Sequence, residues 1–469
     1  MRYLTRDVAN TSRCILFISV SILFVGCEKN DYSVNQTIVY SQLSQDPTRE
    51  LIISWITKDS KQSKNFRYKQ VNEIKFTYIN PQKKEIPKRG DLNLYTVYIT
   101  DLLPGTEYMF QVAGEDIIRR TKTLPSKIPD DGIKVGFAGD AHFEGKGHNK
   151  YDLLTRAMSI NGIDILVGKG DYVDCEGIIG LEQTNRWIGF LDMLDRSLSQ
   201  VGGNFFYVPM ILAVGNHETT PDNGTDPEAA RYLRFFFDNP SKLEPLGKNY
   251  GAVKIGDYLQ LIILDSWHTS YPGGEQKKWL SKVIDNSVLH SVPIMHVSPF
   301  PTYRHPNVEV SVSIRKEWFE ILYNAGNIRI AFDSHEHSWK RTVSLGIANK
   351  IPNHHANEAD IGFFYLGNST YITKSDPGII FFGDGSWGSD SRSRWNPSTT
   401  WYLKDTQDRL NVYKTGHSGI SHENDGKIAG SFWEHIYIAI FKSHQIEVKS
   451  INPAGQIFNE IIVNESLVF

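Results

Sequence analysis

Apolar and polar residues alternate in different ways along this chain, and the pattern divides it into parts. Residues 36–125 contain short β-type runs separated by turn residues, as expected for an all-β region. From residue 133 onward, short apolar runs alternate with helical patterns, which is typical of a layered α/β domain. Residues 127–132 form the linker between these parts. A separate apolar run, residues 14–25, lies before both of them.

The α/β part has a predicted order of strands and helices. The candidate strands are residues 133–138, 164–167, 208–214, 258–264, 293–295, 328–332 and 378–382. The helical patterns include residues 228–237, 275–284 and 314–323, and a closing β pattern covers 432–441 and 445–451. The polar segment 389–429 has the least regular pattern. We therefore predict an α/β (α+β layered) fold for residues 133–469, with two sheets flanked by helices, preceded by an all-β sandwich domain.

The all-β region contains two signals of a sandwich. Trp55 lies in a strand-like run where it suits the core between two sheets, and the turn at Pro104-Gly105 precedes a strand that carries Tyr108. This pattern resembles a fibronectin type III module, which implies seven short strands in two sheets. A small β-barrel fits the same pattern. The region carries no clustered metal-binding residues, so we expect it to pack beside the α/β domain or to shape its entrance.

The amino-terminal part is typical of an export signal. Arginines precede the apolar run 14–25, which is shorter than the roughly 20 residues needed to span a bilayer, and Gly26 and Cys27 follow it. The pattern resembles a bacterial lipoprotein signal of residues 1–26, which implies that Cys27 is lipidated. An ordinary signal peptide and an uncleaved anchor are the alternatives. We expect an exported bacterial lipoprotein, periplasmic or on the outer-membrane surface, held at the membrane by its amino-terminal lipid.

Composition narrows the possible partners. A chain of 469 residues is longer than one core usually organises, which favours two domains. A net charge of -3 with no long basic block argues against an extended nucleic-acid surface. The cysteines are Cys14, Cys27 and Cys175. Removal of the signal and lipidation of Cys27 would leave Cys175 alone, so we expect no internal disulfide and a small buried role for Cys175.

Potential metal ligands follow the predicted strands of the α/β part. Asp140 and His142 come after the first strand, Asp171 after the second and Asn216 after the third. Residues i and i+2 of an extended segment face the same way, so Asp140 and His142 can bind one ion. Asp171 can bridge two cations with its two carboxylate oxygens, and such cations lie about 3.5 to 4 Å apart in two-metal hydrolases. Asn216 offers a neutral oxygen ligand.

Three imidazoles complete the pattern. His296 follows the apolar residues 293–295, and His335 and His337 follow the strand 328–332. Five ligand-bearing segments thus occur in order, each at a predicted junction of strand and loop. Together they indicate a two-metal hydrolytic site, which would also supply the positive centre that a small anionic substrate needs.

In this order the segments resemble the calcineurin-like metallophosphoesterase superfamily, and with the β region in front they are most similar to bacterial relatives of purple acid phosphatases. The resemblance implies one metal ion bound by Asp140, His142, Asp171 and His337, and a second bound by Asp171, Asn216, His296 and His335. It also implies that a hydroxide bound to both ions attacks phosphorus in line. His217 would then protonate the leaving oxygen, with Glu218 orienting it.

The chain departs from that family pattern at three positions. Asp174 stands where purple phosphatases have the Tyr that gives their colour, so we expect a colourless enzyme with Mn, Zn or Fe as its two ions. Cys175 stands where protein phosphatases have a phosphate-binding Arg, so substrate contacts must come from elsewhere. Ser334 replaces the usual Gly before the His pair. His305 lies nine residues after His296, where the resemblance to purple phosphatases implies a substrate-binding histidine near the leaving group, and a solvated loop histidine is the alternative.

These patterns predict a dinuclear metal-dependent hydrolase of small phosphorylated substrates, with monoesters favoured over diesters. A phosphodiesterase of the same superfamily is the alternative within this chemistry. A surface glycan-binding lipoprotein that keeps the fold as a scaffold is the alternative outside it. His217 argues against the last, because a protein without catalysis has little need of an acid beside the metal site.

Overall fold

The computed structural model describes residues 34, 36–58, 60–143, 149–175, 178–219, 227–301, 308–342, 344–348, 364–367, 370–383, 385–389, 413–415 and 434–464. The chain divides into a unit of residues 1–31 and a unit of residues 32–469, and all described residues belong to the second. Three predicted features lie outside the described residues: the signal sequence 1–26, the lipidation site Cys27 and the candidate His305. Most of the polar segment 389–429 lies outside them too.

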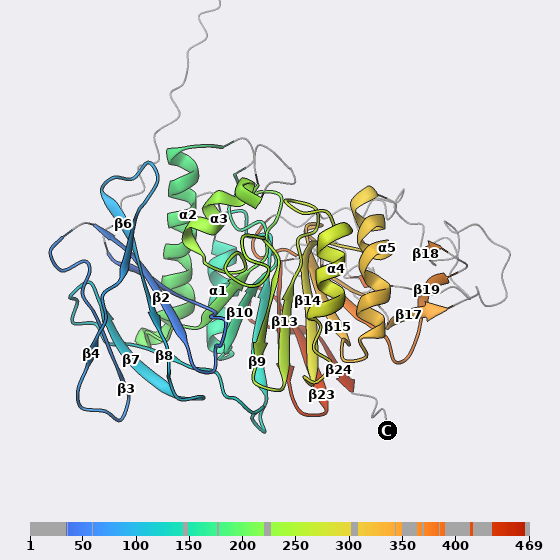
Figure 1. The fold of residues 1–469 in the computed structure, drawn as a ribbon, viewed down its shortest axis with the longest axis horizontal. Coiled ribbons are helices and arrows are strands. Elements are labelled where there is room, and N and C mark those ends of the chain that lie inside the picture. Colours follow the sequence, from blue (N-terminus) through green and yellow to red (C-terminus); the bar gives the residue numbers. More distant parts are fainter. Residues whose placement is uncertain are drawn as a thin grey trace, which may run out of the picture. The chain divides into compact units, whose positions relative to one another are not determined.

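Two large sheets organise the described chain (Figure 1). The first has the order β24 (Ile457–Asn464), β23 (Gln445–Ile451), β22 (Ile436–Phe441), β9 (Ile133–Ala138), β10 (Ile165–Gly168), β11 (Pro209–Leu212), β1 (Ile38–Gln42), β2 (Leu51–Lys58), β6 (Leu92–Ile99) and β5 (Gln82–Glu85). The second has the order β12 (Gly251–Ile255), β13 (Leu259–Ile263), β14 (His290–Val297), β15 (Ile330–Ser334), β20 (Ile380–Gly383), β16 (Lys340–Thr342) and β21 (Tyr413–Thr415). Strands β9 to β11 run parallel to one another, as do β13, β14, β15 and β20.

The two sheets pack face to face over an apolar core. Phe137 of β9 stacks on Phe332 of β15, with ring centroids 3.7 Å apart. Strand β10 shows how the sequence produces two buried faces: Ile165 and Val167 point into this core, whereas Leu166 points to the opposite side, where helices cover the sheet. Successive side chains of a strand alternate between faces, so an unbroken apolar run is what a strand covered on both sides requires.

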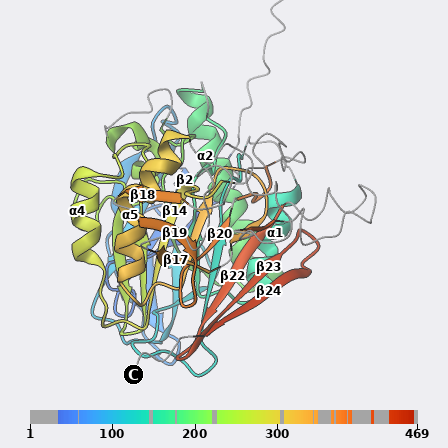
Figure 2. The ribbon, with the colours of Figure 1, turned by 90° about the vertical axis from the view of Figure 1, so that its right-hand side faces the viewer.

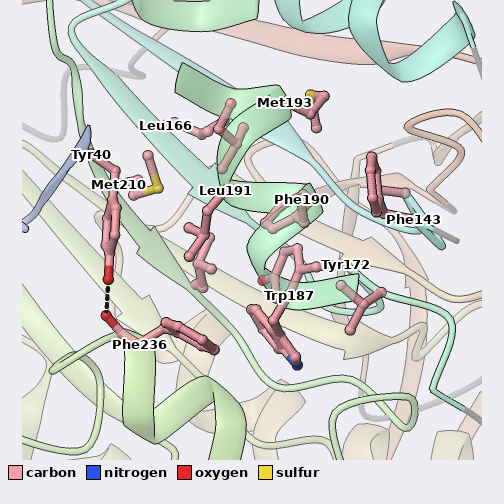
Figure 3. Close-up of a cluster of buried hydrophobic side chains, with 14 of the residues drawn as sticks. Tyr40, Phe143, Leu166, Tyr172, Trp187, Phe190, Leu191, Met193, Met210 and Phe236 are labelled. Atoms are coloured by element: carbon pink, nitrogen blue, oxygen red, sulfur yellow. Dashed lines mark hydrogen bonds between the residues drawn. The ribbon is translucent and has the colours of Figure 1, made fainter. Parts of the chain in front are cut away.

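Helices cover the outer face of each sheet. On the first sheet lie α1 (Asn149–Ile160), α2 (Leu181–Leu194) and the short α3 (Arg231–Phe236). Figure 3 shows side chains of α2, including Trp187 and Leu191, packed toward Leu166 and Met210 of the strands. On the second sheet lie α4 (Gly274–Val283) and α5 (Glu309–Asn324). Figure 2 shows α4 and α5 on one side of the strands and α1 on the other. The predicted order of helix, sheet, sheet and helix is therefore present.

The predicted β-rich region spans β1 to β8 (Figure 1). Its second layer is a sheet of β4 (Thr77–Tyr78), β3 (Phe66–Gln70), β7 (Glu107–Val112) and β8 (Arg119–Lys122). The core between the layers contains Trp55, which stacks on Phe66 and Tyr95 with centroids 5.7 and 5.5 Å away. The hydroxyl of Tyr108 accepts a hydrogen bond from the Leu103 amide at 3.0 Å, the geometry of a tyrosine corner.

The β-rich region is joined to the α/β part by the first sheet itself. Strand β1 pairs in parallel with β11 through Ser41 and Pro209, so one sheet continues from one part into the other. Figure 3 shows a second connection, in which the Tyr40 hydroxyl donates a hydrogen bond to the Phe236 carbonyl at 2.6 Å. The assignment to the fibronectin type III family, and the predicted boundary between residues 125 and 133, stay predictions.

Several predicted boundaries differ from the observed ones. Strands β9 and β23 have the predicted ends, but β14 begins at His290, earlier than predicted, because its polar first residues pair with β13 and are buried. The helix predicted over 228–237 is a 3₁₀ turn, Pro227–Ala230, followed by a short α-helix. A small sheet of β17 (Leu345–Ala348), β19 (Thr370–Lys374) and β18 (Phe364–Gly367) was not predicted.

Two further observations concern cysteine and membrane segments. Cys175 is buried and forms no disulfide, in agreement with the expected packing role. Burial raises the pKa of its thiol far above the ordinary value, so it is held as a neutral side chain. Within the described ranges, no helix has the length and apolar character needed to cross a bilayer.

Candidate metal centre

The carboxyl ends of the parallel strands in both sheets meet at one edge of the fold. Segments after β9, β10 and β11 carry Asp140, His142, Asp171 and Asn216, while β14 and the segment after β15 carry His296, His335 and His337. Because the two sheets pack face to face, these two groups of side chains approach each other across the sandwich. The structure thus brings together all seven residues that the sequence singled out as metal ligands.

The backbone at these positions is left-handed and not extended. Asp140 and His142 have φ of 58° and 45°, Asp171 has φ of 56°, and His335 and His337 have φ of 81° and 54°. The expectation that each i, i+2 pair shares a face of an extended segment is therefore wrong. The pairs converge because the chain turns sharply after each strand. Such φ values cost a non-glycine residue about 1–3 kcal/mol and persist where the surroundings hold them in place, as at functional sites.

The first group of ligand atoms surrounds one oxygen of Asp140. Its Oδ2 atom accepts hydrogen bonds from the His335 amide, at 2.9 Å, and from the Ser334 hydroxyl. Its Oδ1 atom is buried, has no hydrogen-bond partner among the described residues, and lies 3.3 Å from His337 Nε2 and 3.9 Å from His142 Nε2. Burial alone would raise the pKa of this carboxyl, but the two imidazoles hold it well below its usual range. One oxygen is thus positioned by the protein and the other is left for a cation.

The structure explains why a serine, and not the glycine usual in the family, occupies position 334. It ends β15, is fully buried, and uses its hydroxyl to hold Asp140. The departure from the family's Gly therefore adds a contact to a ligand and does not disturb the turn that carries the His pair.

The second group surrounds Nε2 of His296. The other ring nitrogen of His296 lies 2.9 Å from the Lys169 carbonyl, so it donates a hydrogen to that oxygen. Nε2 lies 3.1 Å from Asn216 Oδ1, 3.1 Å from His335 Nδ1 and 3.2 Å from Asp171 Oδ2. Burial opposes a charged ring, yet the Asp171 carboxylate raises the pKa of His296 to about 9. A proton on Nε2 and a metal ion would therefore compete for the same place, and metal binding would release that proton.

Asp171 connects the two groups through a single oxygen. Its Oδ2 atom lies 3.2 Å from His296 Nε2 and 3.5 Å from His142 Nε2, a nitrogen that is buried and has no hydrogen-bond partner within the described chain. Its Oδ1 atom accepts the His217 amide at 2.9 Å. The prediction that Asp171 bridges two cations stays a prediction, and Oδ2 is its oxygen that lies near imidazoles of both groups.

The chemistry of this donor set fits two cations. Three groups of side chains, each with ligand atoms within 4.8 Å of one another, are Asp140, His142 and His337; His142, Asp171 and His217; and Asp171, His296 and His335. These groups contain two buried carboxylates and several imidazoles, and three of their buried atoms lack a hydrogen-bond partner among the described residues: Asp140 Oδ1, His142 Nε2 and His217 Nδ1. Positive ions would satisfy such an arrangement. Asp171 belongs to groups on both sides, as a bridging ligand would.

His217 is positioned by Asp174 and not by Glu218. Nδ1 of His217 lies 3.1 Å from Asp174 Oδ1, and its Nε2 lies 3.9 Å from Asp171 Oδ2. Burial opposes the charged ring, but the contact with Asp174 and the charge of Asp171 raise the pKa of His217 to about 9. The position of Asp174, just after Asp171 in the sequence, was the signal that could have identified this contact.

Glu218 supports the backbone of the site. Its carboxylate accepts the amides of Asp171, at 2.8 Å, Tyr172, at 2.9 Å, and Gly215, at 2.8 Å. Burial and the nearby Asp171 carboxylate raise the pKa of Glu218 to about 7. The predicted orienting role toward His217 is therefore wrong. Glu218 ties the segment after β10 to the segment after β11.

Three glycines leave room for the ligands. A Cβ atom on Gly170 would lie 2.5 Å from His296 Nδ1, one on Gly215 would collide with Asp171 Oδ1, and one on Gly385 would collide with Asp140 Oδ2. Gly385 therefore lies directly against a candidate ligand.

Gly215→Ala is expected to weaken metal binding about 10- to 100-fold, because the added methyl group displaces the Asp171 carboxylate, and losses of this size follow disturbance of groups around metal ligands. Titration of the metal-free protein with Mn²⁺ or Zn²⁺ measures the effect. The control is Gly90→Ala, where the new Cβ has no neighbour within 4 Å. Equal metal affinity in both variants would contradict the steric argument.

Comparison with known proteins identifies the family. Residues 133–417 match the calcineurin-like phosphoesterase family, which is more than half of the chain, and the protein belongs to that family. No curated protein matches the sequence. Among solved structures, a purple acid phosphatase, PPD1, from yellow lupin (Lupinus luteus) seeds is similar at a TM-score of 0.59 with 14% identity, covering 91% of this chain and 74% of the lupin chain. PhoD is similar at a TM-score of 0.59 with 12% identity, covering 91% of this chain and 88% of its own.

The family and the grouped ligands together define the class of protein. It is a metal-dependent hydrolase of phosphoric esters, and the His and Asp groups indicate a dinuclear metal centre. The likeness to the two solved structures, at such low identity, supports the fold alone.

Proposed function

We propose that the protein is a phosphomonoesterase in which two metal ions are bound by the seven converging side chains and His217 donates a proton to the leaving group. The ligands of the first ion are Asp140, His142, Asp171 and His337, and those of the second are Asp171, Asn216, His296 and His335. The observation that carries this proposal is the single Asp171 oxygen that faces imidazoles of both groups.

The metal ions, His217 and Asp174 have separate roles in the proposed hydrolysis. When bound, the two ions neutralise negative charge on the phosphoryl group and activate water for attack on phosphorus. His217 is adjacent to the Asp171 carboxylate, and its Nδ1 lies 3.1 Å from Asp174 Oδ1, so in this proposal Nδ1 faces Asp174 and Nε2 carries the proton that is transferred. A proton donated from Nε2 to the leaving oxygen avoids release of an unstable alkoxide. Asp174 keeps the ring in the orientation and tautomer that this transfer needs.

Asp174 also bears on the identity of the ions. Its carboxylate contacts His217 and the Arg186 guanidinium, and it belongs to none of the three ligand groups found among the described residues. We therefore propose Mn, Zn or Fe without a tyrosinate ligand, and a colourless holoenzyme. Metal analysis and the visible spectrum of the purified protein test this assignment.

A preference for monoesters is expected in parallel assays. Hydrolysis of 4-nitrophenyl phosphate should exceed that of bis(4-nitrophenyl) phosphate by at least about tenfold in kcat/KM, equal to 1.4 kcal/mol of transition-state binding. Both activities should disappear on chelation and return with one divalent ion. The opposite order of the two esters would identify a phosphodiesterase.

We also propose that the mature protein is anchored to the membrane by lipid on Cys27, as the pattern of residues 14–27 suggests. In a bacterial host supplied with labelled palmitate, the full-length protein should be labelled and sediment with membranes. Cys27→Ala should remove both properties. Labelling of the Cys27→Ala variant, or unlabelled wild type, would refute the anchor.

A further inference from the structure

His268 lies at the same edge of the second sheet as the proposed metal ligands. It follows β13, the parallel neighbour of β14, and the Leu264 amide at the end of β13 donates to the Ile294 carbonyl at 2.8 Å. Two residues beyond Ile294, β14 carries His296. Adjacent parallel strands thus deliver two histidines to one place, and the proposed function uses only one of them.

The imidazole of His268 is buried against the metal centre without being part of it. Its ring packs edge-to-face on the ring of His296, with centroids 5.2 Å apart and an interplanar angle of 60°. His268 belongs to none of the three ligand groups found in the described chain. Its Nε2 atom is buried and, among the described residues, has no hydrogen-bond partner. A buried polar atom left without a partner costs about 1–3 kcal/mol, so a partner that arrives with a ligand would recover that loss.

The loop that carries His268 is held rigidly. The Asp265 carboxylate accepts the His268 amide at 2.7 Å and the Thr269 amide at 3.0 Å, and it also accepts the Thr269 hydroxyl. The Asp265 amide is bound in turn by the side chain of Gln276 in α4, at 2.9 Å. Trp267 has a left-handed backbone, with φ of 74°. A loop held by several hydrogen bonds, with a left-handed residue next to an imidazole whose Nε2 atom has no partner among the described residues, is typical of a side chain that is positioned for a ligand.

We propose that His268 is a substrate-binding residue of the same site, and that its Nε2–H donates a hydrogen bond to a phosphoryl oxygen of the ester beside His296. This inference rests on the proposed phosphoester hydrolysis. A phosphoryl group has more oxygens than two ions and one proton donor would contact. The chain has Cys175 where the protein phosphatases that it resembles have a phosphate-binding Arg, so another residue must supply a phosphate contact. His268 supplies a neutral donor on the His296 side of the centre, and it contacts the substrate both before and during the reaction.

The test compares three variants of the metal-loaded protein. His268→Phe keeps a flat ring against His296 but removes the nitrogen, and His268→Gln keeps an amide donor near the position of Nε2. The matched control is His290→Phe, which removes a buried imidazole from the opposite end of β14. Binding of orthophosphate is measured by calorimetry, KM and kcat are measured with 4-nitrophenyl phosphate, and metal content is measured by elemental analysis.

His268→Phe is expected to weaken orthophosphate binding and to raise KM about tenfold or more, the effect of losing one hydrogen bond to a charged group. Its kcat should change less than its KM, and its two metal ions should be retained. His268→Gln should recover most of the affinity, and the control should bind orthophosphate as wild type does. If the Phe variant does not fold, His268→Asn replaces it, because its shorter amide does not reach the position of Nε2.

Wild-type orthophosphate affinity and KM in His268→Phe would overturn the inference, and so would weakened binding that only follows loss of metal. A different result would refute the proposed function. A wild-type protein that binds orthophosphate and hydrolyses no ester would refute the hydrolysis, while the comparison of orthophosphate affinities would still decide the role of His268.

Discussion

Asp171→Asn is expected to lower kcat for 4-nitrophenyl phosphate by at least about a thousandfold, which corresponds to about 4 kcal/mol of transition-state stabilisation. Oδ2 of Asp171 lies near imidazoles of both ligand groups, 3.5 Å from His142 Nε2 and 3.2 Å from His296 Nε2. An amide removes its negative charge, and if the amide nitrogen takes this place a hydrogen donor faces the cations. We expect at least one metal ion to be lost, which elemental analysis of the dialysed protein measures.

A surface variant distinguishes this result from a general effect of charge. Asp257 is exposed, forms an ion pair with Lys127 and is not one of the proposed metal ligands. Asp257→Asn should therefore keep two metal ions and wild-type activity. Circular dichroism of both variants checks that the fold is kept. If Asp171→Asn retained two ions and activity within about threefold of wild type, the proposed centre would be refuted.

His217→Ala is expected to reduce kcat about 10²- to 10⁴-fold on an alkyl phosphate, the range for loss of a general acid. The loss should be smaller on 4-nitrophenyl phosphate, because nitrophenolate leaves without protonation. Since His217 is not among the proposed ligands, both metal ions should remain bound. Asp174→Asn should show the same dependence on leaving group with a smaller loss, because it disturbs only the orientation and proton affinity of the ring.

Glu218→Gln tests which of two acidic residues, Asp174 or Glu218, positions the His217 ring. Glu218 holds backbone amides and does not position the ring, so its change should weaken metal binding without the dependence on leaving group. Equal losses of His217→Ala on both esters would contradict its role as proton donor. A leaving-group effect in Glu218→Gln, absent from Asp174→Asn, would reverse the assignment of the two acids.

The layered fold could be predicted because the central parallel strands, such as β10 and β11, are short and apolar on both faces and are followed by polar segments. Strand β10 illustrates this, since its consecutive apolar residues face the inter-sheet core and the helices in alternation. The join between the β-rich region and the α/β part could not be predicted. It depends on β1 pairing with β11, a contact between residues more than 160 positions apart, and no local pattern specifies it.

The candidate ligands could be predicted as a set, because parallel strands bring their carboxyl ends to one edge and each candidate follows a predicted strand. Their geometry could not. The left-handed φ of Asp140 and His335 arises from turns that the rest of the fold holds in place. The partner of His217 was assigned to Glu218, its neighbour in sequence, whereas Asp174 is its neighbour in space.

Sequence by itself determined the class of fold, the family and the set of candidate metal-binding residues, because these follow from local patterns and from the order of segments. Only the tertiary structure decided which oxygen of Asp171 faces the ligand groups, which glycines lie against them and that His268 stands beside His296 with an unsatisfied nitrogen. Those features depend on distances of a few ångströms between segments far apart in the chain. Such distances are set when the two sheets pack together, and no single segment contains them.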